Sequence, residues 1–547
     1  MTMSGLRAAT GILAVFWVTY LPVRATNFSG WDEWLVVDLT YRGLVALPYE
    51  NRPFSLLFNL PGALLLPRTL MGYWLVHGLY LSFAGVLLHR LCLRLAPGRE
   101  RLAFLAGVFA VVWAPADDMR LDAVLLANYS GFAFGTLLSV TMLVESAYAR
   151  RRLGLALAAA LAFVTIRGLE STAGLVLAAP ALLWIAPRIG SRTRLAWSAV
   201  WLAAAGAAAA LAAGPLLPGH PGSYQVSGLG FDPHPLRVAS RLARQLGFHL
   251  GPLAAPSWGE LLVPVVPAAV VMFVLGWRLL GRTAKSSPPP PSAGGSEGGP
   301  SATARMAAVG LGMALLAYGV LVLSASVVGP GRMQVLSAPG IGLFLAALVS
   351  GLAGRLPAHW GPRAAVLLGS AVVALGAGRT AALQREWDAN SYWPAQDRGL
   401  FGLTRVVPQL EPHTLVVLLD GAGAWPAAFT FHHAVEYLYG GRGRGTVWGA
   451  VPFLYGLQVV PEGILSLPYE SIRSAWRAPP ALYRWDEVVV VRQDAPGGVT
   501  VLDEWPAVLP TLPPAALYAP RARIRAGDPR PPEHALLVGP AGEAGLR

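Results

Sequence analysis

The chain has 547 residues, a net charge of +13 and one cysteine, Cys92. Hydrophobic residues make up 54% of it and charged residues 13%, whereas a soluble domain has about 25% charged residues. This composition excludes an ordinary soluble enzyme, a disordered chain and a fibrous repeat, and one cysteine excludes an internal disulfide. A positive charge of this size would indicate nucleic acid in a soluble protein. Here the arginines flank long apolar runs, so we expect a membrane protein that binds no nucleic acid.

Apolar segments long enough for membrane helices follow one another along the chain. A spanning helix needs about 20 largely apolar residues, and about eleven segments approach that length. They lie near residues 8–22, 70–92, 101–115, 123–144, 152–166, 171–187, 195–217, 259–280, 306–328, 335–354 and 363–380. The first shows no small-residue cleavage site, so we interpret it as an uncleaved anchor. The pattern predicts a mainly α-helical, polytopic membrane bundle.

Arginines gather in alternate loops between these segments, whereas most acidic residues before residue 380 fall in the other loops. The basic loops include residues 94–101, 150–152, 188–194, 278–285 and 355–363. Because basic loops remain in the cytoplasm, we expect the N-terminus inside and the C-terminus outside. Abundant Ala, Gly, Pro and Arg are typical of a GC-rich bacterial genome, so the expected location is the bacterial cytoplasmic (inner) membrane.

The composition changes twice along the chain. Residues 283–304, TAKSSPPPPSAGGSEGGPSATA, predict a flexible cytoplasmic linker between membrane blocks at 1–282 and 305–380. Residues 381–547 contain strand-like runs and one amphipathic helix, and they predict a small outward-facing α/β domain with a Pro-rich tail. The expected strands lie at residues 414–419, 487–492 and 498–502, and the helix at 427–439.

The first outward loop reads FSGWDEWLVVDLTYRG and places Asp32 and Glu33 between Trp31 and Trp34. A partly desolvated carboxylate at a membrane surface has a raised pKa and can act as a general base on an acceptor hydroxyl. The alternative is that the two tryptophans form an interfacial belt and the acids face water. Arg52 follows in NRPF and could hold a phosphate or form a structural ion pair.

The second outward loop reads WAPADDMRLDAVLLANYSG. Adjacent carboxylates such as Asp117 and Asp118 are ligands that a divalent cation, Mg²⁺ or Mn²⁺, accepts together with water or a substrate phosphate. There are two other interpretations: Arg120 could neutralise one of the acids, or the acids could simply favour the start of a helix.

Two later outward turns carry isolated charges. Arg167 and Glu170 lie three residues apart in TIRGLESTAG, where they could pair with each other or bind substrate. Arg332 in GPGRMQVLSAPGIGL could clamp a phosphate bidentately or extend to lipid headgroups. We interpret His432 and His433 as ordinary histidines of the C-terminal domain. The sequence has no Walker A loop and no dinucleotide-binding fingerprint, so a lipid-borne donor fits an enzyme here better than a cytosolic nucleotide.

The order of these motifs resembles that of the GT-C superfamily of polyprenyl-phosphate-sugar-dependent glycosyltransferases, such as protein O-mannosyltransferases and lipid A aminoarabinose transferases. The similar features are WDEW in the first outward loop, NRPF after it, ADD in the second, the hairpin TIRGLESTAG, GRMQVLSAPGIGL, and the outward C-terminal domain. The resemblance covers about residues 1–380 in layout. Two departures stand out: the second-loop acids are contiguous, and Arg167 stands where relatives often carry lysine.

The resemblance implies an inverting sugar transfer from a polyprenyl-phosphate-linked donor to a lipid, glycan or protein acceptor. Asp32 would activate the acceptor hydroxyl, with Glu33 as the competing candidate. Arg332, with Arg52 or Arg167, would hold the lipid phosphate, Glu170 would belong to the same substrate site, and Asp117 and Asp118 would bind a metal or the acceptor.

Two other classes of function are weighed against this one. A transporter or lipid flippase typically shows repeats and charges inside membrane segments, whereas here no repeat is found and the acids lie at segment ends. A non-catalytic envelope assembly protein would use its outer domain for partners. The transferase hypothesis predicts that Asp32 and Arg332 line one outward cavity, about a sugar-phosphate apart (on the order of 10 Å).

Overall fold

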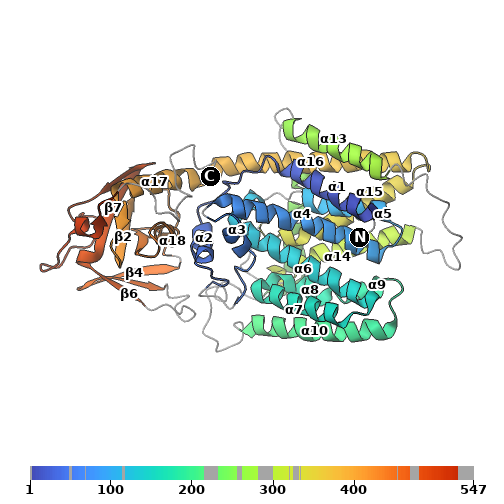
Figure 1. Ribbon diagram of the computed structural model, residues 1–547, viewed down its shortest axis with the longest axis horizontal. Coiled ribbons are helices and arrows are strands. Elements are labelled where there is room, and N and C mark those ends of the chain that lie inside the picture. Colours follow the sequence, from blue (N-terminus) through green and yellow to red (C-terminus); the bar gives the residue numbers. More distant parts are fainter. Residues whose placement is uncertain are drawn as a thin grey trace.

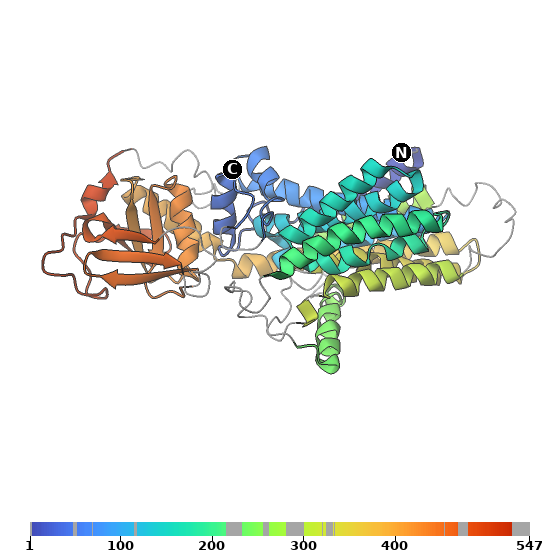
Figure 2. The ribbon, with the colours of Figure 1, turned by 90° about the horizontal axis from the view of Figure 1, so that it is seen from below.

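The computed structural model describes residues 3–47, 52–67, 69–113, 118–214, 232–254, 262–280, 300–319, 321–323, 332, 334–452, 454–468 and 480–527. Figure 1 shows an elongated bundle of helices joined end to end with a smaller C-terminal domain. In Figure 2, a quarter turn away, the C-terminal domain still continues the long axis of the bundle. We call the end of the bundle next to this domain the domain end, and the opposite end the basic end.

The bundle consists of the helices α1 (Met3–Tyr20), α4 (Leu70–Leu95), α5 (Glu100–Val112), α6 (Ala123–Ala149), α7 (Arg152–Gly168), α8 (Ala173–Ala178), α9 (Ala181–Ile185), α10 (Ser191–Ala213), α13 (Leu262–Leu280), α14 (Pro300–Ala317), α15 (Gln334–Gly354) and α16 (Gly361–Asn390). Three further helices lie in the described part of the chain before the C-terminal domain: α2 (Glu33–Tyr41), α3 (Leu60–Leu65) and α12 (Pro235–Phe248). Helices therefore lie at each of the predicted apolar segments, and the segment 171–187 is divided into α8 and α9 at Pro180.

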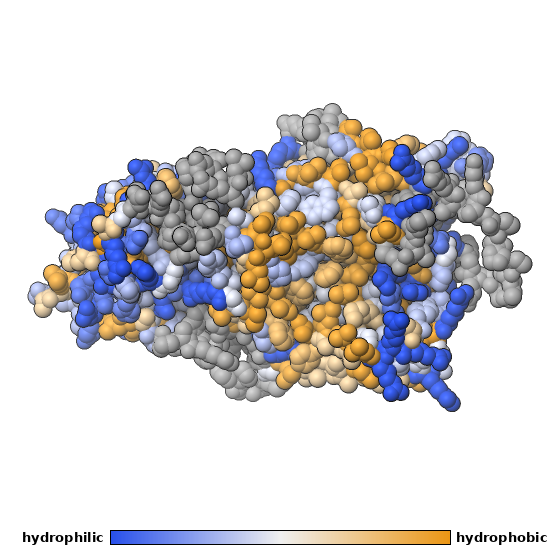
Figure 3. Space-filling view, in the orientation of Figure 1, coloured by the Kyte–Doolittle hydropathy of each residue, from blue (hydrophilic) through white to orange (hydrophobic). Residues whose placement is uncertain are grey.

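Within the described residues, five helices are long and apolar enough to cross a membrane: α4, α6, α10, α15 and α16. On the face that Figure 3 shows, apolar residues cover the middle of the bundle, and hydrophilic residues gather toward both ends of the molecule. Large apolar side chains of the bundle helices, such as Leu195, Leu211 and Trp277, are exposed, and only lipid can cover them without cost. The chain is thus a multi-pass membrane protein, while eleven crossings and their orientation remain predictions.

Glycines permit a close contact between the helices α14 and α15. A Cβ atom on Gly340 would lie 2.4 Å from the backbone nitrogen of Ala314, and one on Gly310 would lie 2.6 Å from that of Phe344. Larger side chains would force the helices apart, whereas small residues let backbones approach within van der Waals contact.

At the basic end, Arg90 forms an ion pair with Glu145 and joins the ends of α4 and α6.

The C-terminal domain begins with α17 (Trp393–Val406) and contains α18 (Ala428–Leu438). Its main sheet has the order β3-β2-β7-β8, in which β2 pairs in parallel with β3 and β7, and β8 is antiparallel. The strands are β1 (Gln409–Leu410), β2 (Thr414–Asp420), β3 (Gly443–Val447), β4 (Tyr455–Val460), β5 (Gly463–Pro468), β6 (Ala481–Arg484), β7 (Val488–Ala495), β8 (Gly498–Val501) and β9 (Ile524–Arg525).

The observed C-terminal domain contains the predicted elements and several more. Strands β2, β7 and β8 and helix α18 lie where the sequence predicts them, whereas the antiparallel sheet β4-β5-β6 is not foreseen. Helix α16 continues ten residues past residue 380, the expected end of the last membrane helix. The expected linker at 283–304 lies outside the described residues as far as residue 299, and α14 includes the remainder.

Candidate functional site

Asp32 and Arg332 meet at the domain end of the bundle. Asp32 is the N-cap residue of α2, and Arg332 lies two residues before α15. Arg332 Nη1 is 3.4 Å from Asp32 Oδ2, and the guanidinium also lies over the ring of Tyr129 on α6, 5.5 Å from its centre. The two charged groups are thus in direct contact, closer than the separation of a sugar-phosphate expected from the sequence.

The side chain of Asp32 is accessible, although protein atoms surround much of it. Its side chain is 42% exposed, and that of Arg332 is 31% exposed. Burial nevertheless raises the pKa of Asp32 above its ordinary value, and Glu33 adds to this effect while Arg332 opposes it. A reachable carboxylate with a raised pKa has the properties required of a general base.

Glu33 has a different environment, because the whole residue is buried. It accepts hydrogen bonds from the backbone N–H of Trp31, at 2.7 Å, and from the N–H and hydroxyl of Ser29. Asp122, at the start of α6, accepts from Val124 N and is electrostatically linked to Glu33; burial and then Glu33 raise its pKa well above the ordinary value. Through these contacts, Glu33 holds the loop before α2 in place.

Arg52 pairs with Glu170 from a distant loop, with Arg52 Nε 2.6 Å from Glu170 Oε2 and a second contact through Nη2. Burial alone would raise the pKa of Glu170, but Arg52, helped by Arg167, lowers it below its usual range. Glu170 thus pairs with Arg52, a partner far away in sequence, and the nearby Arg167 has the smaller electrostatic effect on it.

The expected metal ligands cannot be placed. Asp117 and the side chain of Asp118 lie outside the described residues. Arg120, the alternative partner for these acids, is buried and donates hydrogen bonds to the carbonyl oxygens of Val111 and Trp113, at 2.5 and 3.2 Å. It therefore satisfies carbonyl groups at the C-terminal end of α5.

An apolar cavity of about 170 Å³ begins one helical turn from Tyr129. Ala133 on α6 and Leu336 on α15 belong to its wall, and these residues lie four positions beyond Tyr129 and Arg332 respectively. Other lining residues come from α8, α9 and α14. Asp32 and Arg332 are not among the lining residues of this cavity; they lie beyond it, toward the domain end.

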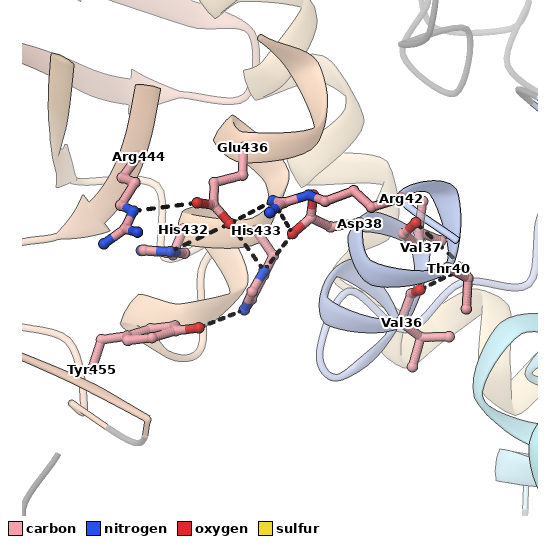
Figure 4. A network of polar contacts seen from close by, with 10 residues as sticks. All are labelled: Val36, Val37, Asp38, Thr40, Arg42, His432, His433, Glu436, Arg444 and Tyr455. Carbon is pink, nitrogen blue, oxygen red and sulfur yellow. Dashed lines mark hydrogen bonds and ion pairs between the residues drawn. The ribbon is translucent and has the colours of Figure 1, made fainter. Parts of the chain in front are cut away.

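A second polar cluster joins α2 to α18 (Figure 4). His433 Nδ1 lies 2.8 Å from Asp38 Oδ2, and Arg42 Nη2 lies 2.7 Å from both Asp38 and Glu436. His433 Nε2 accepts from the hydroxyl of Tyr455 at 2.9 Å. Burial raises the pKa of Asp38, against an opposing hydrogen bond from His433.

In the described part of the chain, Asp38, His433 and Glu436 are the group whose metal-ligating atoms lie within 4.8 Å of one another. Arg42 contacts both carboxylates, so its guanidinium already supplies the positive charge that a metal would bring. The interpretation of His433 as an ordinary domain histidine misses this contact because its partner, Asp38, is 395 residues away in the sequence. No local spacing signal could have revealed it.

Neither a protein-family model nor a curated protein sequence matches this chain. Among solved structures, the fold is similar to crystal structures of ArnT from Cupriavidus metallidurans in the apo state and bound to undecaprenyl phosphate. The undecaprenyl-phosphate-bound structure is 15% identical, with a TM-score of 0.36 over 75% of this chain and 82% of that chain. The apo structure is 16% identical, with the same TM-score over 75% of this chain and 83% of that chain.

Proposed function

We propose that this chain is an integral membrane glycosyltransferase of the bacterial inner membrane. It would move a sugar from a polyprenyl-phosphate donor to a lipid, glycan or protein acceptor on the outer side. The observation that carries the proposal is the contact between Asp32 and Arg332. An accessible base and a phosphate-binding cation share one place, next to an apolar cavity.

The contact has a consequence for the order of events. A donor phosphate that binds the Nη1 side of Arg332, the side that contacts Asp32, would compete with this carboxylate for the guanidinium. Binding of the donor would displace Asp32 from Arg332, and the released carboxylate would lose the cation that lowers its pKa. Donor binding would thus both place the phosphate and strengthen the base.

The reaction is then a single displacement at the anomeric carbon. Asp32 takes the proton from the acceptor hydroxyl, and the acceptor oxygen forms a bond to that carbon. The bond from the carbon to the phosphate oxygen breaks, and its electron pair remains on the polyprenyl phosphate. Arg332 stabilises the negative charge that develops there. One displacement of this kind inverts the configuration of the sugar.

The apolar cavity between α6, α8, α9, α14 and α15 supports a lipid-linked donor. Its lining is almost entirely hydrocarbon, including Leu137, Leu182 and Met313. Because each buried CH₂ contributes about 0.8 kcal/mol, a few isoprene units in this space would supply much of the donor affinity. The phosphate would then lie toward Arg332 and the sugar toward Asp32.

The roles of the remaining predicted residues belong to the same proposal. Arg52, Arg167 and Glu170 would form a second charged group near the donor phosphate or acceptor.

Asp117 and Asp118 would hold Mg²⁺ or Mn²⁺, and a chelator followed by readdition of either ion tests that role. Loss of transfer on chelation with recovery on readdition is the expected result, and unchanged transfer would remove the cation from the proposal.

The deciding experiment measures transfer by the purified full-length protein in lipid nanodiscs. Labelled polyprenyl-phosphate-linked hexoses and pentoses serve as donors, and a bacterial envelope extract supplies acceptors. Native protein should release polyprenyl phosphate and label an acceptor, and Asp32→Asn should lower the rate at least about 100-fold. Glu504→Gln, which changes an exposed carboxylate of the C-terminal domain, is the matched control.

The competing functions predict other results. A flippase or a non-catalytic assembly protein would leave every labelled donor intact in the native protein. Equal rates for native protein and Asp32→Asn, with both variants folded, would remove Asp32 from the mechanism.

A further inference from the structure

We propose that the C-terminal domain is a positioning element of the Asp32–Arg332 site. It would act through the α2–α18 clamp, which consists of Asp38, Arg42, His433 and Glu436. This inference rests on the proposed function for its effect on catalysis, whereas the positioning itself can be measured without any substrate.

Helix α2 depends on its surroundings for its position. It has nine residues, and its N-cap residue Asp32 makes no side-chain capping hydrogen bond. An isolated helix shorter than about 12–15 residues is marginal in water. The place of Asp32 at the start of this helix is therefore determined by the contacts that the helix makes with other elements.

The C-terminal part of the chain holds α2 near both of its ends. Near Asp32, the side-chain oxygen of Gln396 accepts from the indole N–H of Trp34 at 2.8 Å, and its nitrogen donates to the carbonyl oxygen of Gly30 at 2.9 Å. The same nitrogen donates to the carbonyl oxygen of Ala424 at 3.0 Å. The loop after β2 is thus connected to the loop that carries Asp32.

At the other end of α2 the connection consists of charges. Asp38 is 2% exposed and bonds His433, while Arg42 bridges Asp38 and Glu436. Arg444 Nε, on β3, lies 3.3 Å from Glu436 and balances the second carboxylate. These contacts impose a definite geometry, because a shift of α18 against α2 would break both the His433–Asp38 and the Arg42–Glu436 contact.

The clamp lies close enough to the base for its geometry to matter. Asp38 is six residues after Asp32, which corresponds to about 9 Å along the helix axis. A displacement of about 1 Å in a catalytic group can lower a rate about 100-fold. Loss of the clamp is therefore expected to lower kcat while the donor KM, which depends on Arg332 and the apolar cavity, changes little.

The test compares three variants of the full-length protein. His433→Ala removes the bond to Asp38. His433→Asn keeps an N–H donor near the position of Nδ1 and should restore the contact. His432→Ala is the matched control, because His432 is the neighbouring buried histidine and contacts Glu436 and Tyr455 inside the C-terminal domain.

Hydrogen exchange provides the first readout and needs no substrate. We expect His433→Ala to accelerate amide exchange in residues 35–41 of α2 at least about tenfold, whereas exchange in α4 and α6 stays unchanged. His433→Asn and His432→Ala should resemble the native protein. Native exchange of α2 in His433→Ala would overturn the proposal.

Kinetics provide the second readout. We expect kcat of His433→Ala to fall about 100-fold with donor KM within about threefold, and His433→Asn to recover most of the loss. A change in KM alone, or an equal loss in His432→Ala, would show that the clamp only stabilises the domain. If α2 loosens but native protein transfers no sugar, the proposed function fails while the positioning by the clamp stands.

Discussion

Asp32 and Glu33 are neighbours in the sequence but have opposite surroundings. Asp32 is partly exposed beside Arg332, whereas Glu33 is buried and accepts hydrogen bonds from the loop before α2. Helical geometry separates them, because residues one apart point about 100° away from each other. A substitution at each position should therefore change a different property.

We expect Glu33→Gln to destabilise the protein without removing its chemistry. The amide keeps the shape of the carboxyl group but replaces charged acceptors for Ser29 and Trp31 with weaker ones, at a cost of about 1–3 kcal/mol. Thermal unfolding in nanodiscs should show a lower Tm, and the folded fraction should keep a kcat within about tenfold of native. A loss as large as that of Asp32→Asn with a native Tm would instead identify Glu33 as the base.

The pH dependence of transfer follows from the surroundings of Asp32. The base works only when ionised, so kcat/KM should fall as the pH drops through its raised pKa. Arg332 lowers that pKa, so Arg332→Gln should move the acidic limb of the profile to higher pH. The measurement is kcat/KM against pH for both proteins, and a limb that stays in place or moves to lower pH would contradict the assignment.

Among the elements, the helices that border the apolar cavity permit a test of the donor. Gly312 on α14 lines the cavity, and a Cβ added there meets no atom within 4 Å. Gly312→Phe should therefore fill the space without disturbing the helix. We expect the donor KM to rise about tenfold, equivalent to about 1.4 kcal/mol, with an unchanged or higher Tm.

Gly206 on α10 provides the control for this substitution. It is also a helical glycine with open space around its Cβ position, but it lies outside the cavity lining. Gly206→Phe should leave the donor KM unchanged. An equal rise in KM for both variants would mean that the cavity does not hold the polyprenyl chain.

The type of each helix or strand determines whether the sequence could predict it. Helices such as α4 and α15 were predictable because long apolar runs require membrane burial. Strands β2 and β7 are continuous runs of Val and Leu, typical of buried parallel strands. Strands β4 to β6 mix Gly, Pro and polar residues, and their pairing depends on partners that no local pattern names.

At the site, local motifs indicated Asp32 and Arg332 as candidates, but their contact joins residues 300 apart. The pairs Arg52–Glu170 and Asp38–His433 likewise join distant loops. Spacing rules describe one helix or one turn, so they miss contacts that only the folded bundle creates.

For the whole molecule, the separation of charge along the bundle predicts its orientation. Cys92 is buried, so a Cys92→Ser background allows single reporter cysteines. Arg151→Cys tests the basic end, and Val508→Cys, at a residue that is 63% exposed, tests the C-terminal domain. In intact cells a membrane-impermeant thiol reagent should label only the second, and Arg151→Cys should react after permeabilisation. The reverse pattern would place the C-terminal domain in the cytoplasm.

Helix α16 connects both parts of the molecule mechanically. Its 30 residues extend about 45 Å, longer than the hydrocarbon core of about 30 Å. Two residues, Ser391 and Tyr392, separate it from α17, and Ser391 is fixed by a hydrogen bond to the carbonyl oxygen of Phe28. The short connection between α16 and α17 therefore leaves little freedom to bend. A force on the C-terminal domain is therefore transmitted as a tilt of α16 in the membrane.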